Sequence, residues 1–249
     1  MAHRTFAIGD IHGDLVALRA LIQKLPLVAE EDTLVFLGDY VDRGPQSAEV
    51  VRVVRALERD VGCRVVCLRG NHEDGWLRAR REGWPEFVLP PPNGCLAAMR
   101  SFLGEPQPVL GELPKKHELE SLMYGRFLPE DVVEWMEGLP YFYEDEYGIY
   151  VHAGLIEREG RFLHPSETEP KTALLWTRSQ KFFREYDGKH VVVGHTATDY
   201  LPQELSQFTP EDPTDLWAGK HVTAIDTGAG KSGFLTALEL PAFKVYESR

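Results

Sequence analysis

A short apolar run followed by a polar loop occurs three times within the first 75 residues of the chain. The runs are Thr5 to Ile8, Thr33 to Leu37 and Arg64 to Leu68. Apolar residues at helical spacing follow the first two runs, with Pro26 expected to end the first helix and Ser47 to cap the second. Alternating strand, loop and helix predicts a parallel sheet with crossover helices. Ligands of such sheets bind at the carboxyl ends of the strands, so we expect the three loops to form one site.

The remainder of the chain has a different pattern. Residues 75 to about 140 contain Pro90-Pro91-Pro92-Asn93-Gly94 and further prolines, and a helix is expected from Pro129. We interpret this stretch as a mostly helical insertion that covers the site, within a single domain of residues 1–249. Further strands are expected at Tyr141–Tyr143 and Ile149–Val151, which form a hairpin, and at Val191–Val193, Val222–Ile225 and Phe234–Leu240.

The charge of the chain limits its partners. The 39 acidic and 27 basic residues give a net charge of −12, which argues against a general nucleic-acid or anionic-membrane binder. No run of about 18 apolar residues predicts a membrane span, and Asp10 comes too early for a signal peptide. The three cysteines include no Cys-x-x-Cys pair, which favours free thiols in a reducing cytoplasm. We therefore expect a cytoplasmic protein, with a monomer favoured.

Five short blocks each place an oxygen or imidazole donor beside a glycine after an apolar run. The blocks are Gly9–Gly13, Gly38–Gly44, Gly70–Glu73, His152–Gly154 and Gly194-His195. Their candidate metal ligands are Asp10, His12, Asp39, Asn71, His152 and His195. Oxygen and nitrogen donors without thiolate suit Mn²⁺, Fe²⁺ or Zn²⁺, and too few carboxylates are present for a calcium cage. One block alone is usually an ordinary turn or a core histidine, but five in order favour a metal centre.

These blocks resemble the signature of the phosphoprotein phosphatase family within the calcineurin-like metallophosphoesterases. They are most similar to the short bacterial and phage enzymes of the lambda type. The resemblance covers residues 5 to 73 and 149 to 240, including Ile225–Ala229, whereas the insertion contributes almost nothing to it. It implies a mixed α/β (α+β) fold, in which a central β-sandwich is flanked by helices. The parallel sheet would then be only locally right.

The resemblance also implies two divalent ions, with Mn²⁺ expected and iron or Zn²⁺ as alternatives. Their ligands would be Asp10, His12 and Asp39 for the first ion, and Asp39, Asn71, His152 and His195 for the second. Asp39 would bridge both ions, and a hydroxide between them would attack phosphorus directly, with no phosphoenzyme.

Further roles are implied for residues that do not ligate metal. His72 would be the general acid that protonates the leaving group, and Asp42 would hold its imidazole and keep it protonated. Arg43 would bind the phosphate oxygens as a fork, with Arg178 as a second phosphate-binding arginine. These roles imply a serine/threonine protein phosphatase that acts on phosphoserine and phosphothreonine in a phosphoprotein or phosphopeptide, with phosphotyrosine as a further option.

Three alternatives accompany this interpretation. A diadenosine tetraphosphate hydrolase would use the same dinuclear site, and since some dinucleoside polyphosphate hydrolases also keep Asp-Arg-Gly, this alternative stays open. Phosphodiesterases usually end in Gly-His-x-His, whereas this chain has Ala197 at the second histidine position. A phosphopeptide-binding scaffold with an inactive site would be expected to have lost a ligand or the acid, and none is lost here.

Overall fold

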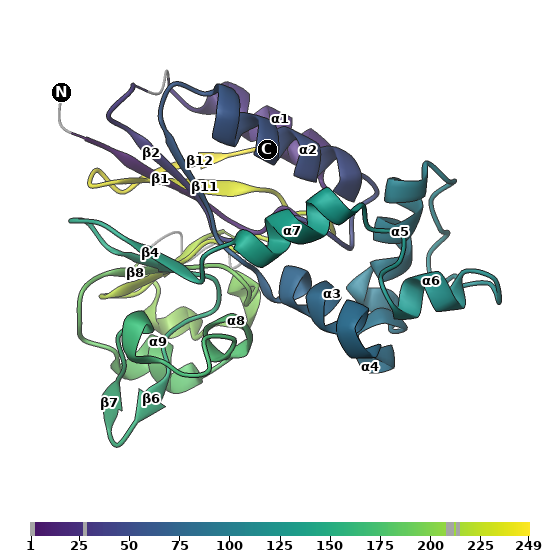
Figure 1. Cartoon of the computed structure of the whole chain (residues 1–249). Coiled ribbons are helices and arrows are strands. Elements are labelled where there is room, and N and C mark those ends of the chain that lie inside the picture. Colours follow the sequence, from purple (N-terminus) through teal and green to yellow (C-terminus); the bar gives the residue numbers. More distant parts are fainter. Residues whose placement is uncertain (1–2, 27–28, 208–211, 213–214) are drawn as a thin grey trace.

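Two facing β-sheets form the centre of the molecule, and helices cover both outer faces (Figure 1). The computed structural model describes residues 3–26, 29–207, 212 and 215–249. The first sheet has the strand order β12-β11-β1-β2-β3, the second β4-β5-β8-β10-β9, and β6 pairs with β7. This architecture confirms the mixed α/β fold with a central sandwich.

The strand bounds are β1 Thr5–Ile8, β2 Thr33–Phe36, β3 Arg64–Cys67, β4 Phe142–Glu144, β5 Ile149–Val151, β6 Glu157–Arg158, β7 Arg161–Phe162, β8 Val191–Val193, β9 Trp217–Ala218, β10 Val222–Ala224, β11 Thr236–Leu240 and β12 Lys244–Glu247. The α-helices are α1 Leu15–Lys24, α2 Ser47–Asp60, α3 Asn71–Glu82, α4 Pro85–Val88, α5 Cys95–Leu103, α6 Leu119–Met123, α7 Glu130–Gly138, α8 Ala173–Trp176 and α9 Gln180–Glu185. Short 3₁₀ turns lie at Pro91–Asn93, Pro165–Glu167, Thr198–Tyr200 and Gln203–Leu205.

Alternating side chains build the layers. In β1, Phe6 and Ile8 join the cluster that contains α1 and α2, whereas Ala7 joins the cluster between the sheets. In β8, Val192 lies in that same central cluster, and its two neighbours pack beneath α9. Because successive strand residues point to opposite faces, a strand that is apolar throughout can serve two cores at once.

The pairing of the strands brings the predicted loops together. In the first sheet β1, β2 and β3 are parallel, and Ile8 pairs with Phe36, which pairs with Cys67. In the second sheet β5, β8 and β10 are also parallel. The parallel prediction holds only for these strands, because β11 runs antiparallel to β1 and β12 antiparallel to β11.

The start of α2 differs from the expectation. Ser47 is the first residue of the helix, and Gln46 stands at the cap position without a side-chain cap bond. The hydroxyl of Ser47 accepts a hydrogen bond from the backbone N–H of Asp42, at 3.0 Å. The cap prediction for Ser47 is therefore wrong, because its hydroxyl stabilises the preceding loop.

Between β3 and β4 the chain is mainly helical, and α3 to α6 form a lobe beside the sandwich (Figure 1). The first turn of α3 carries three residues of one predicted block, Asn71, His72 and Glu73. Among the described helices, none has the length and apolar character needed to cross a membrane.

Candidate active site

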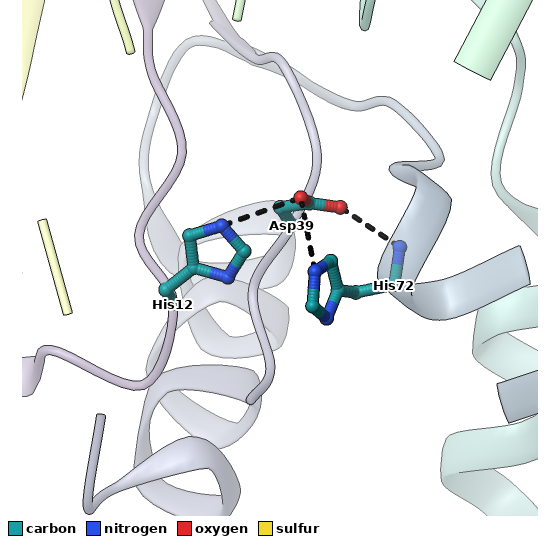
Figure 2. A group of neighbouring side chains, drawn as sticks. All are labelled: His12, Asp39 and His72. Atoms are coloured by element: carbon teal, nitrogen blue, oxygen red, sulfur yellow. Dashed lines mark hydrogen bonds and ion pairs between the residues drawn. The ribbon is translucent and has the colours of Figure 1, made fainter. Parts of the chain in front are cut away.

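The carboxylate of Asp39 lies at the centre of the converging loops. Its Oδ2 is 3.3 Å from Nε2 of His12 and 3.9 Å from Nε2 of His72 (Figure 2). Its Oδ1 is 3.5 Å from Nε2 of His152 and accepts the backbone N–H of His72 at 3.0 Å. Asp39 therefore belongs both to a group with His12 and to a group with His152 and His195.

Asp10 and Asn71 complete the two groups. One carboxylate oxygen of Asp10 is 3.8 Å from Nε2 of His12. Both carboxylate oxygens of Asp10 accept the backbone N–H of His195. The side-chain oxygen of Asn71 is 2.9 Å from Nε2 of His152 and 2.8 Å from Nδ1 of His195. The structure thus brings all six predicted ligands together; their division between two ions stays a prediction.

The donor set fits divalent cations. Nδ1 of His152 donates to the carbonyl of Leu37 at 2.9 Å, so the neutral ring presents a lone pair at Nε2. That lone pair faces the side-chain oxygen of Asn71, and two such acceptors repel each other unless a cation lies against both. Oδ2 of Asp39 and Nε2 of His195 are buried without a hydrogen-bond partner in the described structure. Orphaned acceptors of this kind are what a bound metal satisfies.

The electrostatics of the site also suit a metal. Burial lowers the pKa of His12, and the positive charge of Arg43 lowers it further. Burial likewise lowers the pKa of His152 and of His195, so the imidazoles are neutral ligands at neutral pH. Burial raises the pKa of Asp10 well above its usual value, and the neighbouring Asp226 carboxylate raises it further.

We expect metal affinity to rise with pH. Below its raised pKa the Asp10 carboxyl is protonated, and because a bound cation needs the carboxylate, binding must release that proton. Affinity should therefore increase until the pH exceeds that pKa. Calorimetric Mn²⁺ titrations in two buffers of different ionisation enthalpy measure the release. Asp226→Asn removes one of the two carboxylate charges that raise this pKa in addition to burial, so it should weaken the dependence, whereas affinity independent of pH would contradict the expectation.

The site residues adopt unusual backbone conformations. Among the described residues other than glycine, positive φ angles occur at His12, Asp39, Asp42, Arg43 and His195, with values of 47°, 54°, 71°, 63° and 66°. Glu159 and Phe243, which lie outside the blocks, also have positive φ. Such left-handed conformations are costly for residues with a Cβ, and they concentrate at functional sites. The loops therefore hold the donors in place at the expense of local stability.

A hydrogen-bonded group of side chains beside the metal ligands positions His72. Its Nδ1 is 2.6 Å from Oδ2 of Asp42, a buried carboxylate that also accepts the indole N–H of Trp76 at 2.9 Å. Burial opposes protonation of His72, but the carboxylates of Asp39 and Asp42 outweigh it and raise the pKa of this imidazole. His72 thus presents Nε2 toward Asp39 while Nδ1 is held from behind.

Sequence reasoning assigned no role to Trp76. It lies four residues after His72 on α3, and residues at this spacing share a helix face, so the spacing was an available signal. Its indole N–H donates to the same carboxylate of Asp42 that holds His72, so the two side chains fix Asp42 together. An aromatic residue on an apolar helix face reads more readily as core packing, which Trp76 also provides.

Glu73 is another residue whose role was missed. Its buried carboxylate accepts the backbone N–H groups of Asp39, Tyr40 and Gly70 at 2.9 to 3.0 Å. It therefore joins the second and third loops to each other. A glutamate at the third position of a helix commonly reaches back to the cap, and that pattern was the available signal.

The two arginines differ in position. The guanidinium of Arg43 contacts Nε2 of His12, and its Nε is buried without a hydrogen-bond partner in the described structure. Arg178 follows α8 and is exposed. Its positive charge contributes to the low pKa of His195, after burial and His152, so Arg178 lies on the His195 side of the site. Phosphate binding by both arginines stays a prediction.

Oxygen and imidazole donors gathered at the strand ends of a β-sandwich define a metal-binding α/β protein. The sequence model of the Calcineurin-like phosphoesterase family matches residues 3–224. The chain therefore belongs to this family of metallophosphoesterases, which use a dinuclear site of divalent metal ions.

Three known proteins illustrate the similarity. A "Bis(5'-nucleosyl)-tetraphosphatase, symmetrical" of Pectobacterium carotovorum subsp. carotovorum (strain PC1) is 45% identical over 69 residues, which is 28% of this chain and 23% of that protein. A Caenorhabditis elegans protein provisionally named serine/threonine-protein phosphatase C06A1.3 is 47% identical over 66 residues, 26% of this chain and 18% of that protein. A solved structure provisionally titled a diadenosine tetraphosphatase is 20% identical with a TM-score of 0.60, covering 98% of this chain and 92% of that chain.

The two sequence matches cover similar shares of this chain, and each spans less than a quarter of the relative's own length. Symmetrical bis(5'-nucleosyl)-tetraphosphatases of several other bacteria match this chain over the same length, so more of these relatives carry that name than the phosphatase name. The structural match, at 20% identity, shows the fold. The choice between substrates must come from the site itself.

Proposed function

We propose that the chain is a metal-dependent phosphoprotein phosphatase that hydrolyses phosphoserine and phosphothreonine monoesters, with phosphotyrosine as a further substrate. The observation that carries this proposal is the buried arrangement of His72, Asp42 and Trp76. A serine alkoxide is a poor leaving group, so its hydrolysis gains greatly from a held, protonated acid. A phosphate chain leaves as a stabilised anion and gains less from such an acid.

Each residue of the site then has a definite role in this reaction. Divalent ions, with Mn²⁺ proposed, would be held by the six ligands and supply positive charge beside the phosphoryl oxygens. Arg43 binds a non-bridging oxygen through the fork of its guanidinium. His72 gives the proton on Nε2 to the leaving oxygen, while Asp42 keeps Nδ1 hydrogen-bonded and the ring oriented. The left-handed loops fix these groups before the substrate arrives.

A second candidate function is symmetrical hydrolysis of dinucleoside tetraphosphates. Its support comes from the names of several relatives, such as the Pectobacterium protein at 45% identity over 69 residues, and the comparisons favour it over the phosphatase. Such a hydrolase would use the same six donors. Hydrolysis of an anhydride would depend less on proton donation by His72 and on its support by Asp42.

A direct comparison of substrates separates the two candidates. For the Mn²⁺-loaded protein at neutral pH, we expect kcat/KM for a phosphoserine peptide to exceed that for diadenosine tetraphosphate by at least about tenfold. This ratio corresponds to roughly 1.4 kcal/mol of transition-state free energy. Both substrates are assayed side by side on one preparation. A higher value for the dinucleotide would establish the second candidate instead.

A further inference from the structure

A cavity of about 300 Å³ opens beside Arg43, outside the group of metal ligands. Its walls come from the loop after β2 and from the segments around α4 and α5. They are mainly aliphatic and proline side chains: Pro45, Leu89, Pro90, Pro91, Val109 and Leu110. This volume is at the lower end of the range for ligand pockets.

The cavity borders the loop after β2 that carries Asp42 and Arg43. A Cβ on Gly94 would lie 2.1 Å from the backbone nitrogen of Arg43, so the two backbones are in direct contact. The next residue, Cys95, places its sulfur 3.7 Å from Oδ2 of Asp42. Because Arg43 lines the cavity and its guanidinium contacts His12 in the site, an occupant of the cavity would lie next to a phosphate bound by Arg43.

The outer wall of the cavity is held by an ion-pair network centred on the buried Arg100. Arg100, on α5, donates to Glu118 at 3.0 Å and to Glu112 at 2.6 Å. The other carboxylate oxygen of Glu112 accepts the backbone N–H of Val109 at 3.0 Å. This network fixes a loop whose two aliphatic side chains face water, since Val109 is 73% exposed and Leu110 fully exposed. A structured loop that exposes adjacent apolar side chains is typical of a binding surface.

The chemistry of the walls selects the occupant. The charged residues of the lining are Arg43, which would bind the phosphate, and Glu112, whose carboxylate is bound by Arg100. The lining contains no aromatic ring on which a nucleobase could stack. We infer that this cavity binds an apolar residue next to the phosphorylated residue of a protein substrate. The inference rests on the proposed phosphatase function and adds a sequence preference to it.

Two phosphoserine peptides test the inference. They differ only in whether the three residues on each side of the phosphoserine are leucine and proline or serine and glycine. For the wild-type protein we expect kcat/KM to be about tenfold higher for the apolar peptide, the usual scale for apolar discrimination in a pocket. Val109→Ser/Leu110→Ser should reduce this ratio to about one. Val16→Ser, at an exposed apolar position on α1, is the matched control and should keep the ratio.

The contrary outcomes are distinct. Equal wild-type rates on both peptides, or an unchanged ratio in the double variant, would overturn the cavity assignment and leave the phosphatase function intact. Hydrolysis of diadenosine tetraphosphate without hydrolysis of either peptide would overturn both. A dimer that the double variant dissociates, seen by light scattering, together with an unchanged peptide ratio, would assign the surface to a second copy of the chain.

Discussion

Asp39→Asn should abolish turnover and reduce bound metal to less than one ion per chain. Asp39 is the residue shared by both ligand groups, with one oxygen toward His12 and the other toward His152. An amide presents one weaker donor oxygen instead of a charged carboxylate, so both groups lose affinity together. We expect kcat to fall by about 10³-fold or more, roughly 4 kcal/mol of transition-state free energy. Metal analysis after dialysis and an assay of p-nitrophenyl phosphate hydrolysis measure the two effects.

The same substitution should leave the fold intact. Asparagine tolerates the left-handed backbone that Asp39 adopts, and its side-chain oxygen can still accept the N–H of His72. Circular dichroism and thermal unfolding of the metal-free protein check this point. Asp60→Asn, at an exposed position in α2, is the matched control and should keep both metal and activity. Two bound ions per chain in Asp39→Asn would contradict the bridging role.

The sequence predicts those parts of the site whose donor residues come directly after a strand. Asp10, Asp39 and Asn71 each come after an apolar run, and parallel pairing carries the ends of those runs to one edge. The meeting of these loops therefore follows from local sequence and one topological rule. His152 and His195 add to the same site, because β5 and β8 are also parallel and adjacent.

The packing of the two sheets face to face was harder to predict from the sequence. A continuous apolar run such as Val191–Val193 fits a buried parallel strand and a sandwich strand equally well. Here it serves the core between the sheets with Val192 and the core beneath α9 with its neighbours. The sandwich came from the family resemblance, and the structure confirms it.

Groups that act through long-range contacts were the hardest to predict. The hydroxyl of Ser47 can bond either to its own helix or to another loop, and only the fold selects the bond from Asp42. The network around Arg100 depends on where two glutamates in an aperiodic, proline-rich segment come to lie. Neither choice leaves a periodic signal, so the cavity beside Arg43 was not foreseen.

His72→Asn should lower kcat on an alkyl phosphate by about 10²–10⁴-fold, the range for general acid catalysis. The loss on p-nitrophenyl phosphate should be smaller, because its phenoxide leaves without much help from a proton. The acid must be protonated, so wild-type activity on the alkyl ester should decline as the pH rises past the raised pKa of His72. In the variant that decline should disappear.

The leaving-group dependence distinguishes an acid from a structural residue. The ring of His72 is buried and contacts Phe87, so its removal could also lower activity by loosening the site. A loosened site would reduce both rates by the same factor, whereas loss of a proton donor reduces them in proportion to the basicity of the leaving oxygen. Steady-state rates on substituted phenyl phosphates and one alkyl phosphate, for the variant and for the exposed control His117→Asn, provide the comparison. Equal losses across the series would show that His72 only positions its neighbours.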